Sequence, residues 1–130
     1  MEITRTFDIL QAGKDNYENR TVIAVKRNGV WDEYTIDRYS QMVHNLSYGL
    51  LAMGLRPGDK IANISGNRPE WNIVDMGITQ AGMVHVPIYP TISLDEYKFI
   101  LKHAEVRLIL VGNKSLYQKL KPLTTELVNF

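Results

Sequence analysis

The 130-residue sequence contains no cysteine, which excludes disulfide bonds and thiolate chemistry and suits a reducing compartment. No charge sign dominates either. The formal net charge is +1, and basic residues are scattered among acidic ones, which gives no electrostatic case for binding nucleic acid or a membrane surface. No apolar run approaches transmembrane length, and the first 16 residues lack the apolar core of a secretory signal. We therefore expect a cytoplasmic protein of one domain. Composition does not decide whether a parent enzyme that contains this chain associates peripherally with a membrane.

Motifs that carry well-known chemistry are also missing. The chain has no GxGxxG, no GxxxxGK[ST] and no GxSxG nucleophile elbow. Its three histidines, His44, His85 and His103, show no metal-ligand spacing with one another or with acidic residues. The sequence favours a hydrogen-bonded structural role for each of them. It predicts no catalytic, cofactor-binding or metal-binding residue in this chain.

The elements that are present begin with a β-hairpin. Residues 22–26 and 31–35 are two short β-rich runs, and residues 6–16 have the weak pattern of a short helix. Asn28-Gly29 lies between the runs, and this dipeptide is a strong signal for a two-residue hairpin turn because both residues accept positive φ. An antiparallel hairpin is therefore expected near the start of the chain.

A long helix should follow the hairpin. Thr35 is a candidate N-cap, and apolar residues recur at three- and four-residue steps from Ile36 to Leu50. Gly54 suits the left-handed position after the helix, and residues 56–59 (RPGD) have the composition of a tight turn. Helix and turn together lead the chain into its second half.

The second half alternates strands and helices. The apolar strands expected are residues 60–65, 83–88 and 106–111. Three helices are expected between and after them: one capped by Asn67, one that begins at a capping box at Ser93, and a last one from Ser115 to Leu127. Strands that are apolar along most of their length and separated by helices are typical of parallel sheets. The fold class expected is α/β, mainly a parallel sheet with helices on both faces, preceded by the hairpin.

Any ligand crevice in such a fold lies at the carboxyl ends of the strands. The side chains near those ends that could line it are Asn67, His85, Tyr89 and Thr91. A phosphate loop before the second helix is disfavoured, because Gly66 stands alone and Pro69 removes a backbone amide. Helix capping and a strand leaving its sheet explain the same residues, and the sequence favours these structural roles.

Four segments carry a family resemblance, and they are Tyr34-Thr35, Gly54–Asp59 (GLRPGD), Ser65–Trp71 (SGNRPEW) and Ala81–Thr91 (AGMVHVPIYPT). Together they resemble the adenylate-forming superfamily. Within it, NRPEW and VPIYPT are similar to the long-chain fatty acyl-CoA synthetases more than to luciferases or peptide-synthetase adenylation domains. The resemblance runs from about Thr21 to Val111.

The resemblance implies an AMP-forming ligase that makes an acyl-adenylate from ATP and a fatty acid, with Mg²⁺, and passes the acyl group to CoA. The family's phosphate loop, adenine segment, ribose-binding aspartate and catalytic lysine have no counterpart here. We therefore expect residues 1–130 to be a single partial domain, the front portion of an AMP-binding domain with no second domain, inactive alone.

The partners implied are the remainder of the parent enzyme and, in that parent, a fatty acid. Exposed sheet edges and apolar surface should also favour self-association. Two other interpretations stay open, a stand-alone α/β ligand-binding module and a scaffold that binds a partner without catalysis.

Overall fold

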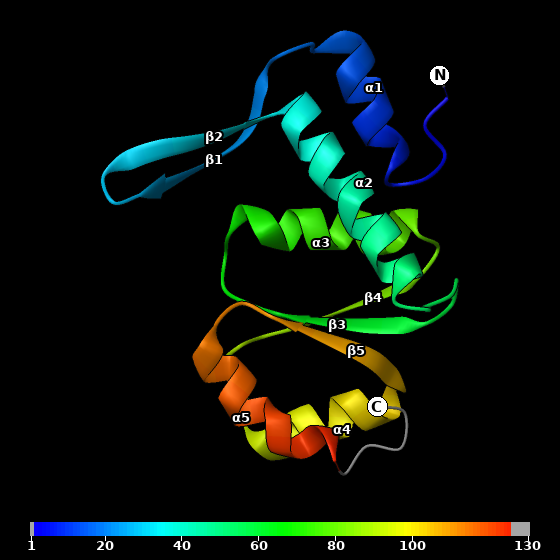
Figure 1. The fold of residues 1–130 in the computed structure, drawn as a ribbon, viewed down its shortest axis with the longest axis vertical. Coiled ribbons are helices and arrows are strands. Elements are labelled where there is room, and N and C mark those ends of the chain that lie inside the picture. The colour runs from blue at the N-terminus through cyan, green and yellow to red at the C-terminus, as the bar shows by residue number, and fades with distance from the viewer. Residues whose placement is uncertain (1, 126–130) are drawn as a thin grey trace.

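The computed structural model describes residues 2–125, in which helices and strands alternate (Figure 1). In chain order the elements are α1 (Asp8–Asn16), β1 (Thr21–Arg27), β2 (Val30–Thr35), α2 (Ile36–Ala52), β3 (Lys60–Ile64), α3 (Pro69–Gln80), β4 (Val84–Ile88), α4 (Leu94–His103), β5 (Val106–Val111) and α5 (Lys114–Thr124). In these residues no helix combines the length and the apolar character needed to cross a membrane. The predicted end of the last helix, at Leu127, lies outside the described residues.

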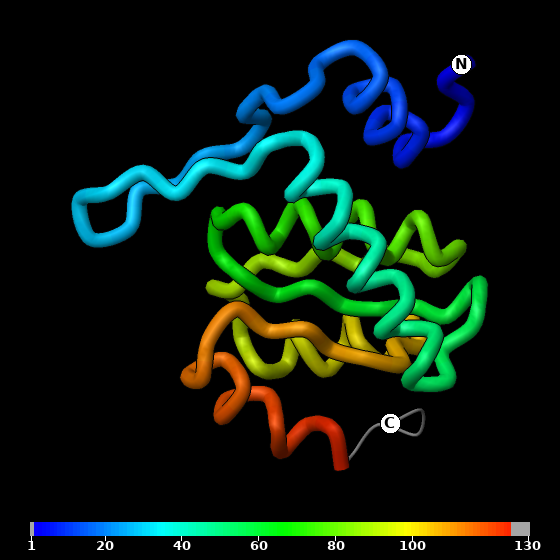
Figure 2. The backbone as a smooth tube through the Cα atoms, turned by 45° about the horizontal axis from the view of Figure 1, so that its top comes forward, coloured from blue at the N-terminus to red at the C-terminus, as the bar shows by residue number. Residues whose placement is uncertain are grey.

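Strands β1 and β2 form the predicted antiparallel hairpin. Arg27 pairs with Val30, so that only Asn28 and Gly29 form the turn, with φ of 50° and 82°. Two positive φ values match the twist of the strands that a two-residue turn connects. The hairpin projects away from the rest of the molecule, beyond α2 (Figure 2).

Strands β3, β4 and β5 form the predicted parallel sheet, in the order β4-β3-β5. The central strand β3 is hydrogen-bonded on both sides, and Ile61, Ala62 and Ile64 in it have no exposed surface. Strand β4 lies at an edge. This position explains how Pro87, which has no amide hydrogen, is tolerated in the strand.

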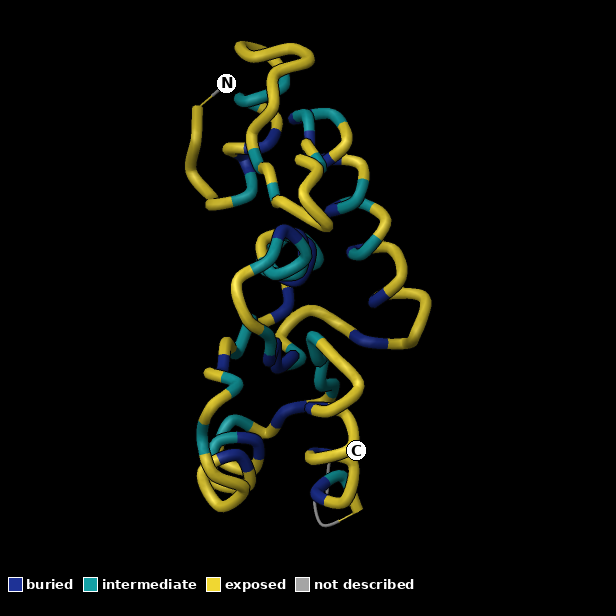
Figure 3. The backbone as a smooth tube through the Cα atoms, turned by 90° about the vertical axis from the view of Figure 1, so that its left-hand side faces the viewer, coloured by how far each residue is buried: buried dark blue, intermediate teal, exposed yellow. Residues whose placement is uncertain are grey.

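Helices cover both faces of this sheet, as predicted, with one layer of helices on one face and two successive layers on the other. Helices α4 and α5 cover one face, with a core of Tyr97, Leu101, Leu116 and Leu120 against the strands. On the other face α3 packs on the sheet and α2 packs on α3 (Figure 1). Buried residues consequently gather between successive layers (Figure 3). Helix α3 is covered on two sides, which its single predicted apolar stripe did not indicate.

Helices α2 and α3 approach closely at Gly77. A Cβ atom added there would lie 2.7 Å from Leu46 Cδ2 and 3.1 Å from Leu46 Cβ, well inside ordinary contact. Beside this point the buried Ser47 hydroxyl donates to the Gly77 carbonyl oxygen at 2.8 Å. A glycine inside a helix costs stability on its own. At position 77 the close helix packing is the compensating reason.

The predicted N-caps of α2 and α4 are confirmed, and that of α3 is wrong. The Thr35 hydroxyl accepts from the Arg38 amide, and Ser93 and Glu96 form the predicted capping box. Asn67 was predicted to cap α3, but Arg68 occupies the N-cap position and its side chain does not cap. The reason is Pro69, because the residue before a proline is held extended, and Arg68 has φ −163° and ψ 156°.

Ion pairs through Glu70 attach the hairpin to the layered part of the fold. Glu70 Oε1 accepts from Arg27 Nη2 on β1 at 2.7 Å, and Glu70 Oε2 accepts from Arg68 Nε at 2.9 Å. The Arg68 hydrogen bond, reinforced by Arg27, lowers the pKa of the Glu70 carboxyl from 4.5 to about 2. A carboxylate held at the first turn of α3 also suits the positive end of the helix dipole.

The contact at Gly77 predicts opposite effects for two alanine substitutions. Gly77→Ala forces Leu46 to move and should lower the free energy of unfolding by about 1–3 kcal/mol, the usual cost of overpacking. Gly49→Ala, in the exposed interior of α2 with open space around it, should raise that free energy by up to about 1 kcal/mol. Urea unfolding of both variants measures the difference. Equal effects would contradict the close approach.

The lowered pKa of Glu70 predicts a pH-dependent contribution to stability. Because the folded pKa lies below the unfolded one, the contribution is present above about pH 4.5 and is lost as pH falls toward 2. Glu70→Gln should therefore destabilise the protein at pH 7, and the difference from wild type should shrink below pH 4.5. Glu18→Gln, at an exposed residue, is the matched control and should change little. A Glu70 carboxyl that titrates by NMR at its ordinary value would refute the pairing.

Candidate functional site

The carboxyl ends of β3, β4 and β5 meet at one edge of the sheet, and the chain leaves them in different directions. After β3 it rises to α3 on one face, whereas after β4 and β5 it passes to α4 and α5 on the other (Figure 1). Such a divergence is where open α/β sheets form ligand crevices. The fold therefore offers a crevice on either side of β3.

On the side between β3 and β5, backbone contact joins the ends of the two strands. A hollow of about 230 Å³ lies beside this contact, lined by Asn63, Ser65, Arg68, Glu70, Trp71, Val74, Leu110, Val111 and Gly112. The Gly112 amide donates to the Ile64 carbonyl oxygen at 2.9 Å, and a Cβ on Gly112 would lie 2.5 Å from Ser65 Cβ. Arg68 Nη1 donates to the Gly112 carbonyl oxygen at 2.6 Å. Only glycine permits this approach of the two loops. Arg68 is thus a structural clamp that joins the start of α3 to the end of β5.

The side between β3 and β4 is open. A hollow of about 590 Å³ lies there, lined by Ser65, Gly66, Asn67, Trp71, Pro87, Ile88, Tyr89, Pro90 and Thr91. Three of the four residues predicted for a crevice, Asn67, Tyr89 and Thr91, are therefore brought together. The Tyr97 hydroxyl donates to the Tyr89 carbonyl oxygen at 2.9 Å, which fixes the chain where it leaves β4. The Tyr89 side chain is 79% exposed.

His85, the fourth predicted residue, does not line this hollow. Alternation along β4 turns its side chain toward α3, where it is 7% exposed and Nδ1 lies 2.7 Å from Asp75 Oδ1. Its ring meets Trp71 edge-on, with centroids 5.2 Å apart. His85 Nε2 and Asn63 Nδ2, buried in the same part of the structure, have no hydrogen-bond partner among the residues described. His85 thus packs against the Trp71 ring and is not part of the lining of the hollow.

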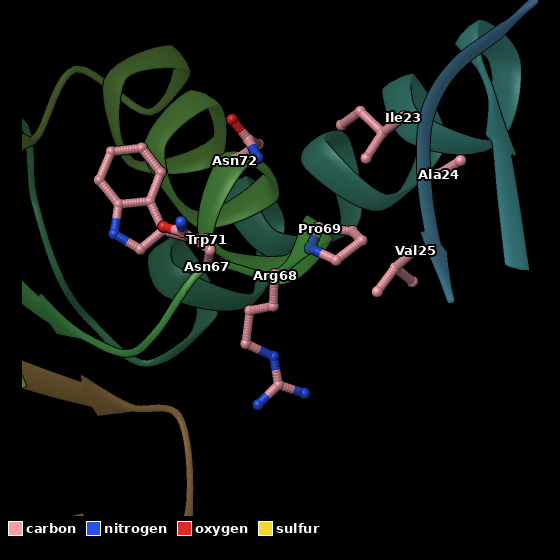
Figure 4. A pocket seen from close by; sticks show the side chains of 8 residues that line it. All are labelled: Ile23, Ala24, Val25, Asn67, Arg68, Pro69, Trp71 and Asn72. Atoms are coloured by element: carbon pink, nitrogen blue, oxygen red, sulfur yellow. The ribbon is translucent and has the colours of Figure 1, made fainter. Parts of the chain in front are cut away.

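Another hollow lies between the hairpin and the start of α3 (Figure 4). Its volume is about 460 Å³, with Ile23, Ala24 and Val25 of β1 on one side. The opposite side is formed by Asn67, Arg68, Pro69, Trp71 and Asn72. Asn67 and Trp71 belong to both hollows, so the two meet at the amino end of α3. Sequence reasoning missed the β1 wall because it depends on where the hairpin docks.

The lining of the larger hollow can contact a ligand, but it contains no group suited to acid–base catalysis. It offers the Trp71 and Tyr89 rings, the Asn67 amide and the Thr91 hydroxyl, and its described residues include no carboxylate, histidine or lysine. Nearby polar side chains are engaged: Arg68 with Glu70, and His85 with Asp75. Across residues 2–125 no three His, Asp or Glu side chains are grouped to hold a metal ion. These residues do not fit Mg²⁺, and they can bind or orient a ligand without performing acid–base chemistry.

Known proteins share this sequence pattern. The family described as AMP-binding enzyme matches residues 10–129. The long-chain-fatty-acid–CoA ligase FadD15 of Mycobacterium bovis is 31% identical over 88 residues, 68% of this chain and 15% of the relative. Fatty acyl-CoA synthetase A of Dictyostelium discoideum is 27% identical over 113 residues, 84% of this chain and 17% of the relative. The chain therefore spans less than a fifth of the length of these relatives.

Solved structures share the fold. A protein of Rhodopseudomonas palustris provisionally assigned as a long-chain-fatty-acid CoA ligase superposes with a TM-score of 0.84 at 22% identity, covering 95% of this chain and 30% of the other. The anthranilate CoA ligase AuaEII, in complex with anthranoyl-AMP, also gives 0.84 at 22% identity, covering 95% and 23%. Together with the match over residues 10–129, these findings show that the chain belongs to the AMP-binding enzyme family.

Proposed function

We propose that this chain forms the front framework of the AMP-binding domain of a long-chain fatty acid–CoA ligase. The match over residues 10–129 to the AMP-binding family is the observation that carries the proposal, and relatives named as fatty acid ligases support it. The parent enzyme would use ATP and CoA to convert a fatty acid into its CoA thioester through an acyl-adenylate.

The site supports a framework role within that enzyme. The open hollow beside β4 supplies a wall lined by aromatic rings and an amide, and the Gly112 contact holds together the loops that follow β3 and β5. The groups that bind Mg²⁺ and transfer the acyl group would come from other parts of the parent. This chain would then position the wall of a site that the remainder of the enzyme completes.

A stand-alone ligand-binding module is the second candidate. It is favoured by one observation, the open hollow of about 590 Å³ with Trp71 and Tyr89 in its lining. Pockets of this size hold small ligands in many proteins. The two candidates differ in whether the isolated chain binds ATP or a fatty acid by itself.

Activity and binding measurements on the 130-residue protein separate these candidates. We expect no ATP-dependent acyl-CoA formation above the buffer blank, while FadD15 of Mycobacterium bovis, assayed in parallel, serves as the positive control. Calorimetry should likewise show no saturable heat with ATP or with a long-chain fatty acid. Turnover by the chain alone would refute the framework proposal. Saturable binding that Trp71→Ala abolishes and Trp31→Ala, at an exposed hairpin residue, leaves intact would establish the module instead.

A further inference from the structure

Asn28 is the one asparagine in the sequence that is followed by glycine. An asparagine in this position can lose its side-chain amide without an enzyme, because the amide nitrogen of the next residue attacks the side-chain carbonyl carbon. Glycine permits this attack because it has no Cβ to obstruct the approach. The dipeptide that forms the hairpin turn is therefore also a reactive pair.

The turn presents this pair to water. Asn28 and Gly29 are both exposed, and a Cβ built on Gly29 would have no atom within 4 Å. The Gly29 amide donates to no backbone oxygen among residues 2–125. The hairpin projects beyond α2, so the layered part of the fold does not cover its tip (Figure 2). Neither burial nor a backbone hydrogen bond thus withholds the attacking nitrogen.

Asn19 supplies an internal comparison. Its φ is 58°, close to the 50° of Asn28, and it is also exposed. The residue that follows it is Arg20, whose amide donates to the Tyr17 carbonyl oxygen at 3.0 Å. The Arg20 side chain also crowds the approach to this nitrogen. The two asparagines therefore share exposure and a left-handed conformation, and they differ in the nitrogen that would attack.

The folded turn slows the reaction. In a left-handed residue the side chain and the following amide nitrogen point away from each other, so ring closure at Asn28 requires the turn to open. Docking of the hairpin opposes this opening through the Arg27–Glu70 ion pair at 2.7 Å and through Ile23 and Val25, which contact the core formed by α1, α2 and α3. A two-stranded hairpin is marginally stable by itself. The rate of the reaction therefore depends on how often the hairpin opens.

We propose that Asn28 is a site of spontaneous deamidation that alters the hairpin turn with time. The Gly29 nitrogen bonds to Asn28 Cγ and loses its proton, the Cγ–Nδ2 bond breaks, and ammonia departs from a cyclic imide. Water then opens the imide at either carbonyl, which gives aspartate or isoaspartate without an oxidant or a cofactor. Each product adds one negative charge, and isoaspartate also adds one carbon atom to the backbone of the turn.

The isoaspartate form cannot keep the present turn. The pairing of Arg27 with Val30 leaves room for two residues only, and an extra backbone carbon shifts the two strands relative to one another. Arg27 is the residue that reaches Glu70, so the shift weakens the attachment of the hairpin to α3. The hollow between β1 and the start of α3 then loses its fixed wall. The aspartate form keeps the turn, because aspartate accepts positive φ.

Incubation of the whole 130-residue protein at mildly alkaline pH, followed by peptide mass spectrometry, tests this site. Asn28 should convert on the order of tenfold faster than Asn19, with isoaspartate in excess over aspartate. Glu70→Gln removes the ion pair to Arg27 and should speed the conversion of Asn28 several-fold, because the hairpin opens more often. Conversion of Asn19 should stay unchanged in this variant, which shows that the rest of the chain remains folded.

Asn28→Gly is the matched control, because glycine accepts positive φ and has no side-chain amide to lose. After incubation its hairpin amides should exchange with deuterium as before, whereas those of the wild type should exchange faster with no change in β3. Conversion of Asn28 no faster than that of Asn19, or equal acceleration of both by Glu70→Gln, would overturn the proposal. So would incubated protein that is rich in isoaspartate and whose hairpin amides exchange at their original rates.

Discussion

Strand β3 is the constraint on which the rest of the structure depends. It is paired on both sides, with β4 and with β5, and its residues are buried against helices of both layers. Ile61 faces α3, whereas Ala62 and Ile64 face α4 and α5. Each fully buried isoleucine contributes about 1.5–3 kcal/mol. Because one strand serves both cores, the two helical layers cannot form independently of it.

The same strand determines where a ligand could bind. At its carboxyl end the loops diverge. The contact of Gly112 with Ser65 narrows the space on one side to a hollow of about 230 Å³, while the hollow beside Tyr89, of about 590 Å³, lies on the other. Charged groups around this edge are engaged with one another, as Arg68 is with Glu70. The chain therefore supplies shape and walls at this edge. This is the physical basis of the framework role that we propose for it.

Local chemistry made most of the fold predictable, and long-range packing made the rest unpredictable. Asn28-Gly29 and the Ser93 capping box act within a few residues, so their signals are readable in sequence. The Arg68 clamp on Gly112 joins residues 44 positions apart, and no local pattern announces it. Asn67 and Tyr89 were placed at the crevice by the carboxyl-end rule. The same rule predicted His85 for the crevice, but its side chain turns toward Asp75 on α3, because successive side chains of β4 point to opposite faces of the sheet.

Hydrogen exchange tests the central claim, that the chain builds its own core around β3, most directly. Amides of Ile61, Ala62 and Ile64 should be the slowest to exchange, with an opening free energy equal to that of global unfolding measured in urea. Amides of the projecting hairpin β1–β2 should exchange faster, at a lower opening free energy. Exchange in β3 as fast as in the hairpin would contradict the account, since the layers would then be held together by something other than this strand.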